Sequence, residues 1–174
     1  AQAKDIIPKT WQQGIHKSVK ISLQDNTKYP MVHLRRVGAQ PVILLHGFGG
    51  NAHNWMELGS DLYNKGYDVW AFTWSKNKNR NIEQAGASTV KEIVNYVFAK
   101  TGKRVFIAGH SLGGIVSKIY ALGIVKSLKT GKSIINKYTQ WKNSLRVKGI
   151  VSISSPNGLR TEEARPYLTI FSNM

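Results

Sequence analysis

Hydrophobic and polar positions along this 174-residue chain follow two different periods. Four apolar runs are typical of buried strands: residues 42–46, 67–72, 104–108 and 147–154. Between them, apolar residues recur at helical spacing in three segments: residues 54–66, 90–102 and 111–129. At the start of the first helical segment Asn54 is a suitable cap, with Glu57 three residues later, and Gly66 is a suitable end. Because strands alternate with helices, the pattern predicts an α/β fold with a mostly parallel sheet and helices on both faces.

The remaining segments are less regular. Residues 1–14 contain proline and glycine and are expected to form an irregular arm. Alternation over residues 18–23, and more weakly over 31–37, predicts two antiparallel strands at one edge of the sheet. The polar and basic residues 130–146 are expected to form a surface helix or excursion. Since no repeat or second domain interrupts the pattern, residues 1–174 are interpreted as a single domain.

A serine stands between the third apolar run and the helical segment that follows it. The sequence there, Gly109-His110-Ser111-Leu112-Gly113, is a G-x-S-x-G pattern placed after a strand and before a helix. A serine at the tip of so tight a turn has strained backbone angles, and glycines on either side let strand and helix pass closely. The turn exposes the Ser111 hydroxyl near the N–H groups of the helix start, which favour negative charge. Ser111 is therefore a candidate nucleophile.

A second glycine-rich segment, His46-Gly47-Phe48-Gly49-Gly50, follows the apolar run that begins at Pro41. Together the two segments resemble the α/β-hydrolase superfamily, and within it the bacterial lipases and esterases, over residues 40–158. Those enzymes carry an HG-x loop after the third strand and a GHSxGG elbow after the fifth. The resemblance implies an oxyanion hole formed by the N–H groups of Phe48 and Leu112. The resemblance also assigns five residues to the loop and the elbow: His46, Gly47, Gly109, His110 and Gly113. It implies no proton-transfer role for the two histidines among them.

The rest of a hydrolytic triad is missing from this sequence. A serine hydrolase needs a histidine to take the serine proton and a carboxylate to orient that histidine, and in this family both follow the nucleophile. Here His110 is the last histidine, and the only later carboxylates are those of Glu162 and Glu163. Among the upstream histidines, His53 is the one expected on a loop near the mouth of the site, so it is a candidate base.

The number of strands suggests a reason for this gap. The chain supplies the strands of the fold through the sixth, and residues 167–171 are a candidate start of the next strand or part of a lid. A parallel sheet without its last strands would expose a long apolar edge. We therefore expect a second polypeptide, released from a common precursor by proteolytic processing, to supply the last strands with the Asp or Glu and the His. A truncated chain and a non-catalytic homologue are the alternatives.

The chain is strongly basic, with 25 Lys and Arg against 9 Asp and Glu and a net charge of +16. Because the basic residues are spread widely and accompany no nucleic-acid motif, the charge is interpreted first as a source of solubility and second as attraction to an anionic membrane surface, and not as nucleic-acid binding. The absence of cysteine excludes disulfides and thiolate metal sites, and no apolar run approaches a membrane span. The first residues, Ala-Gln-Ala-Lys, fit a mature end left after signal-peptide removal in a secreted or periplasmic protein.

These features predict a serine carboxylic-ester hydrolase that acts on lipid or other acyl esters through an acyl-enzyme on Ser111. Apolar neighbours of the serine favour an acyl chain. Trp74, which follows a strand, is a candidate residue of the acyl pocket, although a tryptophan at such a position is more commonly a core or rim residue. This chemistry requires neither a metal nor an organic cofactor. The alternative is a lipid- or partner-binding protein that keeps the fold without turnover.

Overall fold

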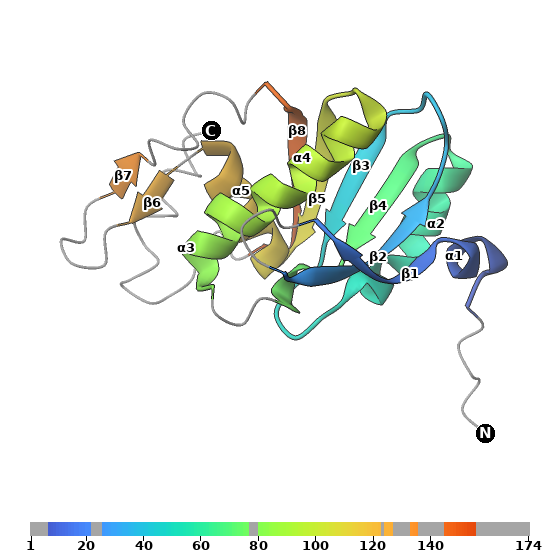
Figure 1. Ribbon diagram of the computed structural model, residues 1–174, viewed down its shortest axis with the longest axis horizontal. Helices are drawn as coiled ribbons and strands as arrows, with labels where there is room; N and C mark the ends of the chain where they lie inside the picture. Colours follow the sequence, from blue (N-terminus) through green and yellow to red (C-terminus); the bar gives the residue numbers. More distant parts are fainter. Residues whose placement is uncertain are drawn as a thin grey trace.

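The computed structural model describes residues 7–21, 26–76, 80–122, 124–126, 133–135 and 145–155. Within these ranges the chain folds around a six-stranded sheet in the order β1-β2-β4-β3-β5-β8 (Figure 1). Its strands are β1 (Ile15–Lys20), β2 (Lys28–Leu34), β3 (Pro41–Leu45), β4 (Asp68–Phe72), β5 (Val105–His110) and β8 (Val147–Ile153). The last four strands are mutually parallel, and β2 and β1 continue the sheet antiparallel beyond β4. The predicted α/β fold with a mostly parallel sheet is confirmed.

Alternate residues of the central strand β3 enter two separate cores, one on each face of the sheet. Ile43 and Leu45 belong to a core formed with helices α4 (Val90–Thr101) and α5 (Leu112–Leu122). Val42 and Leu44 belong to a second core, formed with helices α1 (Lys9–Gln13) and α2 (Met56–Asn64) on the opposite face (Figure 1). All five residues of β3 are buried, because a strand covered on both faces has no solvent side.

The parallel strands run in one direction, so their carboxyl ends meet at one edge of the sheet. The loop after β3, the short helical turn Trp74–Lys76 after β4 and the turn from β5 into α5 all leave from this edge. In open α/β sheets this is the edge where ligands bind. The fold therefore brings the two glycine-rich segments of the sequence together.

Three sequence predictions about helices are wrong. Residues 9–13 form α1 and not an irregular arm, because burial of Trp11 in the second core stabilises this single turn. The helical segment after β3 is capped by Asn51, whose side chain accepts from the backbone N–H of His53, while Asn54 completes the capping box from within. Helix α5 ends at Leu122, and Ile124–Lys126 form a short strand where the helix was predicted to continue.

The short strand after α5 is β6 (Ile124–Lys126), which pairs antiparallel with β7 (Ser133–Ile135). The sequence also failed to predict α3 (Ile82–Gln84) and the π-helical turn Ala85–Thr89 that joins it to α4. By contrast, the predicted end of α4 at Gly102 is confirmed. Gly102 follows the last helical residue and adopts the left-handed conformation, with a φ of 67°. No helix in the described part of the chain is long and apolar enough to cross a membrane. The predictions for residues 1–6 and 156–174, including the strand at 167–171, lie outside the described residues.

Candidate active site

Ser111 occupies the sharp turn between β5 and α5. Its φ of 52° lies in the left-handed region, which a residue with a side chain enters only at a cost in backbone strain. Hydrogen bonds hold this turn in place. The Ser111 N–H donates to the carbonyl of Ile153 on β8 at 3.0 Å, and its own carbonyl accepts from the Gly114 N–H at 3.0 Å and from the Ser155 hydroxyl at 2.9 Å. The backbone of Ser111 is thus fixed by the neighbouring strand and by its own helix.

The glycines around Ser111 allow helix α5 to approach the sheet closely. A Cβ atom placed on Gly109 would lie 2.4 Å from the carbonyl carbon of Gly113. A Cβ atom placed on Gly113 would lie only 2.1 Å from the carbonyl oxygen of Leu45, at the end of β3. Neither position accepts a side chain without displacing backbone. The spacing of the G-x-S-x-G pattern therefore has a direct steric reason here.

The loop after β3 lies directly beside Ser111. It forms a tight turn in which the Gly50 N–H donates to the Gly47 carbonyl at 3.1 Å, and Gly49 has a φ of 70°. A Cβ atom on Gly47 would lie 3.1 Å from the Cβ of Ser111, so the glycine keeps the space beside the serine open. Phe48 stands at the tip of the turn with its side chain 92% exposed. Among the described residues, the amides of Phe48 and Leu112 have no hydrogen-bond partner.

A pocket of about 560 Å³ opens between this loop and Ser111. Its lining combines the glycine turn with four apolar and four polar residues: His46, Gly47, Phe48, Gly49, Gly50, Asn54, Trp55, Leu58, His110, Ser111 and Ile153. The sequence did not single out Trp55, Leu58 or Ile153 as site residues. Their helical and strand patterns do not distinguish a residue that faces a pocket from one that faces the core. The pocket brings together residues that are far apart in the sequence around the half-buried Ser111.

Trp74 supports the wall of this pocket from behind and is absent from its lining. The side chain is buried in the first core, and its indole N–H donates to the His46 carbonyl at 2.9 Å. The His46 ring stacks on the Trp74 ring at 5.3 Å between centroids. The interpretation of Trp74 as a residue of the acyl pocket is therefore not supported by its position. Trp55, Leu58 and Phe48 supply the apolar lining instead.

The histidines near Ser111 are engaged in different ways. His46 is buried, and burial lowers its pKa below 6.5, an effect that the hydrogen bond from Nδ1 to the Gly47 carbonyl opposes. His110 is exposed and lines the same pocket as Ser111. His53 lies away from the pocket, where its Nδ1 accepts from the Trp11 indole N–H at 3.0 Å. None of the three makes a hydrogen bond to the Ser111 hydroxyl within the described part of the chain.

Residues 40–173 match the family model described as the alpha/beta hydrolase fold. The chain belongs to this family. The match includes both glycine-rich segments, the sheet from β3 to β8 and the pocket at Ser111.

Solved structures of several hydrolases share the fold of this α/β hydrolase. A putative thioesterase from Silicibacter sp. TM1040 has 14% identity and a TM-score of 0.63, with 94% of this chain and 57% of that chain covered. An epoxide hydrolase from Vigna radiata has 17% identity and a TM-score of 0.58, with 92% of this chain and 46% of that chain covered. The mature form of a Bacillus licheniformis lipase has 17% identity and a TM-score of 0.54, with 73% of this chain and 47% of that chain covered. This α/β hydrolase thus spans about half the length of these relatives.

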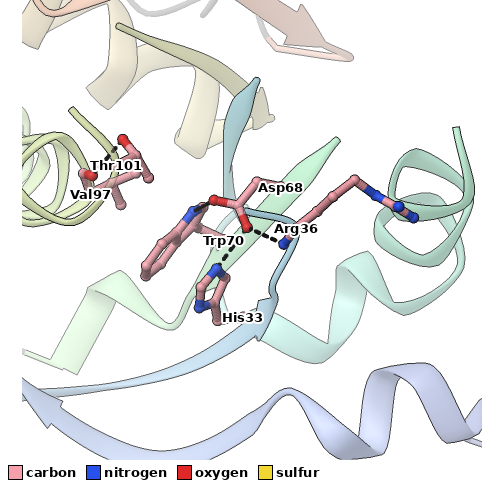
Figure 2. Close-up of polar contacts among 6 residues, drawn as sticks. All are labelled: His33, Arg36, Asp68, Trp70, Val97 and Thr101. Carbon is pink, nitrogen blue, oxygen red and sulfur yellow. Dashed lines mark hydrogen bonds and ion pairs between the residues drawn. The ribbon is translucent and has the colours of Figure 1, made fainter. Parts of the chain in front are cut away.

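Among the described residues, one aspartate forms an ion pair with a histidine, and this pair of Asp68 and His33 is shown in Figure 2. Asp68 opens β4, and its Oδ1 accepts from His33 Nε2 at 2.8 Å and from the Arg36 backbone N–H at 2.9 Å. Its Oδ2 accepts from the Trp70 indole N–H at 2.8 Å, and the Trp70 ring stacks on His33. Because Ser111 follows the carboxyl end of β5 and Asp68 stands at the amino end of β4, this pair does not serve Ser111. A triad is therefore not assembled within the described residues.

Proposed function

We propose that this α/β hydrolase cleaves carboxylic esters through an acyl-enzyme on Ser111. The observation that carries the proposal is the strained, glycine-flanked turn that presents Ser111 to an apolar pocket. The Ser111 oxygen attacks the ester carbonyl carbon while a base takes its proton. The alcohol then leaves with a proton, and water attacks the acyl-serine to release the acid. A fold kept only for binding has no need of a serine held at a φ of 52°.

The amides of Phe48 and Leu112 are proposed to form the oxyanion hole. Both belong to turns that converge on Ser111, one after β3 and the other at the first residue of α5. Neither is hydrogen-bonded within the described residues, so both are available to the carbonyl oxygen of a substrate. Two backbone donors and the start of a helix stabilise the negative charge that develops on this oxygen.

The chemistry of a serine nucleophile favours esters over epoxides, even though an epoxide hydrolase is among the structures with this fold. Attack of an alkoxide on an epoxide carbon would leave an alkyl ether on the enzyme. Water does not cleave such an ether under mild conditions, so turnover would stop after one cycle. Attack on an ester carbonyl leaves an acyl ester, which water hydrolyses with help from the same base and oxyanion hole.

The walls of the pocket favour an apolar acyl group. Trp55, Leu58 and Ile153 line it, and the side chain of Phe48 at its rim is 92% exposed. A large aromatic side chain so exposed at the mouth of a pocket is suited to contact with a lipid chain. We therefore infer a lipid or other acyl ester as substrate, with no metal or organic cofactor in the reaction.

The base and the acid are proposed to come from a further polypeptide segment that joins the sheet at β8. Among the described strands β8 lies at the end of the sheet next to β5, and it holds Ser111 through the Ile153 carbonyl. Val151 of β8 is 54% exposed, an unusual state for an apolar residue in a parallel strand of this fold. A strand added outside β8 would cover this residue and end at the same edge as Ser111. That position suits a loop that carries histidine.

Turnover of matched substrates tests this proposal. Protein purified from its native source, with any polypeptide that accompanies it, should hydrolyse p-nitrophenyl acyl esters and leave styrene oxide unchanged. We expect an initial burst of p-nitrophenol if deacylation is slow, because the acyl-enzyme forms before water releases it. Denaturing mass analysis of the same sample should reveal a histidine-containing companion segment. Epoxide turnover without ester turnover would overturn the assignment of the reaction.

A further inference from the structure

A second pocket, of about 390 Å³, lies at the edge of the sheet opposite Ser111. The turn before β3, the start of β4 and the loop between α4 and β5 form its rim. It is separate from the proposed active site, because no residue lines both pockets. The reaction proposed for Ser111 therefore does not involve this second pocket.

The lining of the second pocket is strongly basic. It contains two arginines, two lysines and two histidines: His16, His33, Arg35, Arg36, Lys100 and Lys103. Asp68 is the single carboxylate among its lining residues. Such a concave surface of one charge sign concentrates the electrostatic field within it and attracts ions of the opposite sign.

The single carboxylate of Asp68 offsets only part of this positive charge, and its hydrogen bonds are made to groups of the fold. Both oxygens are occupied, one by His33 Nε2 and the Arg36 backbone N–H, the other by the Trp70 indole (Figure 2). The side chain is only 5% exposed. Burial raises the pKa of Asp68, but the hydrogen bonds from His33, Arg36 and Trp70 outweigh burial and hold the pKa below 3.8. Asp68 is therefore a fixed structural anion that positions His33 at the pocket.

Two of the four long basic side chains remain available to a ligand. The Arg36 guanidinium donates to the Tyr63 carbonyl and covers the Tyr63 ring, so it is already engaged. Lys103 donates to the Gly38 carbonyl, which ties the two rim loops to each other. Arg35 and Lys100 are exposed, and neither forms an ion pair or hydrogen bond within the described residues. The ammonium of Lys100 lies 5.6 Å from the centre of the Tyr96 ring, which holds it over the pocket wall.

The walls around these cations are rigid. The His33 and Trp70 rings stack at 3.5 Å between centroids, and Tyr96 meets Trp70 edge to face at 6.0 Å. Gln40 donates to the Arg104 carbonyl at 2.8 Å and adds a second tie between the two rim loops. A preformed pocket loses little conformational entropy when a ligand binds, so fixed charges there are more effective than mobile ones.

We propose that this pocket binds an oxyanion of the phosphate type, presented by a small molecule or by a lipid headgroup. Arg35 supplies a planar fork of N–H donors and Lys100 a compact positive charge, the two donor types that bind phosphate oxygens. The His33 ring, held by its hydrogen bond to Asp68, lines the same pocket. A phosphate dianion offers enough acceptor oxygens for both groups, whereas chloride offers no directed acceptor.

Titration of inorganic phosphate into the full chain, at constant ionic strength set with sodium chloride, tests the proposal by calorimetry. We expect saturable binding to one site. Arg35→Gln and Lys100→Gln should each weaken it about tenfold, since each removes charge-assisted hydrogen bonds. Lys20→Gln is the matched control, because Lys20 is an exposed lysine at the end of β1 away from His16. It removes the same charge and should leave the affinity unchanged.

Vesicles identify the source of the anion. If phosphatidylcholine vesicles that contain phosphatidic acid compete with phosphate and pure phosphatidylcholine vesicles do not, the site binds a lipid headgroup. If neither vesicle competes, the ligand is a small phosphate compound. The proposal is overturned if phosphate binding does not saturate, if both pocket variants bind as the wild type does, or if Lys20→Gln weakens binding as much as they do.

Discussion

Replacement of Ser111 by alanine should lower kcat for ester hydrolysis by a factor on the order of a million, because the acyl-enzyme has no other oxygen to form on. Alanine and serine meet nearly the same strain at a φ of 52°, so the fold should survive the substitution. The residual rate reflects binding and the oxyanion donors alone. The measurement is the rate of p-nitrophenyl ester turnover, with thermal unfolding of each variant followed by circular dichroism.

Ser60→Ala is the matched control for this experiment. Ser60 lies on α2, where its hydroxyl donates to the Met56 carbonyl at 2.6 Å, and it does not line the pocket of Ser111. The substitution removes the same atom from a described serine and should leave turnover unchanged. Ester turnover that survives in Ser111→Ala would show that another group carries out the chemistry.

Asp68→Asn should lower the free energy of unfolding by about 2 to 3 kcal/mol at neutral pH, through loss of charge-assisted hydrogen bonds in a buried site. An asparagine oxygen can still accept from His33 Nε2 and the Arg36 backbone N–H. Its amide NH₂ group then faces the Trp70 indole N–H, and two donors cannot bond to each other. Chemical denaturation of wild type and variant measures the difference.

The effect of Asp68→Asn depends on pH in a defined direction. Burial raises the pKa of Asp68, but its hydrogen bonds outweigh burial and lower the folded-state pKa below the ordinary value of 3.8. The charged carboxylate therefore stabilises the fold above about pH 4, and this contribution is lost as the pH falls through the lower, folded-state pKa. The difference between wild type and variant should shrink in acid.

Asp61→Asn is the control for charge removal on its own. Asp61 is exposed on α2, and its side chain has no partner among the described residues. The free energy of unfolding should change by less than about 0.5 kcal/mol. An equal loss in both aspartate variants would contradict the structural role given to Asp68.

The sequence predicted the elements whose cause is local. Buried strands such as β3 and β4 appear as apolar runs, and Gly102 marks the end of α4 through its own backbone preference. The turn at Ser111 could be predicted for the same reason, since a side chain on Gly109 would collide with Gly113, only four residues later. These features depend on short-range sterics that residue types record directly.

The features that the sequence did not predict depend on contacts between distant segments. Helix α1 is only five residues long and exists because Trp11 packs into the core beneath α2. The choice of Asn51 over Asn54 as helix cap depends on where the loop after β3 turns, since both side chains suit the role. The pairing of His33 with Asp68 joins two strands that are neighbours only in the folded sheet.

The most direct test of the central claim is to map a fluorophosphonate adduct by mass spectrometry on protein purified from its native source. A fluorophosphonate forms a stable phosphonyl ester with a serine that is activated as a nucleophile. We predict a single adduct, located on Ser111 in the peptide that joins β5 to α5. No adduct on Ser111, or an adduct on another residue in its place, would contradict the assignment of Ser111 as the nucleophile.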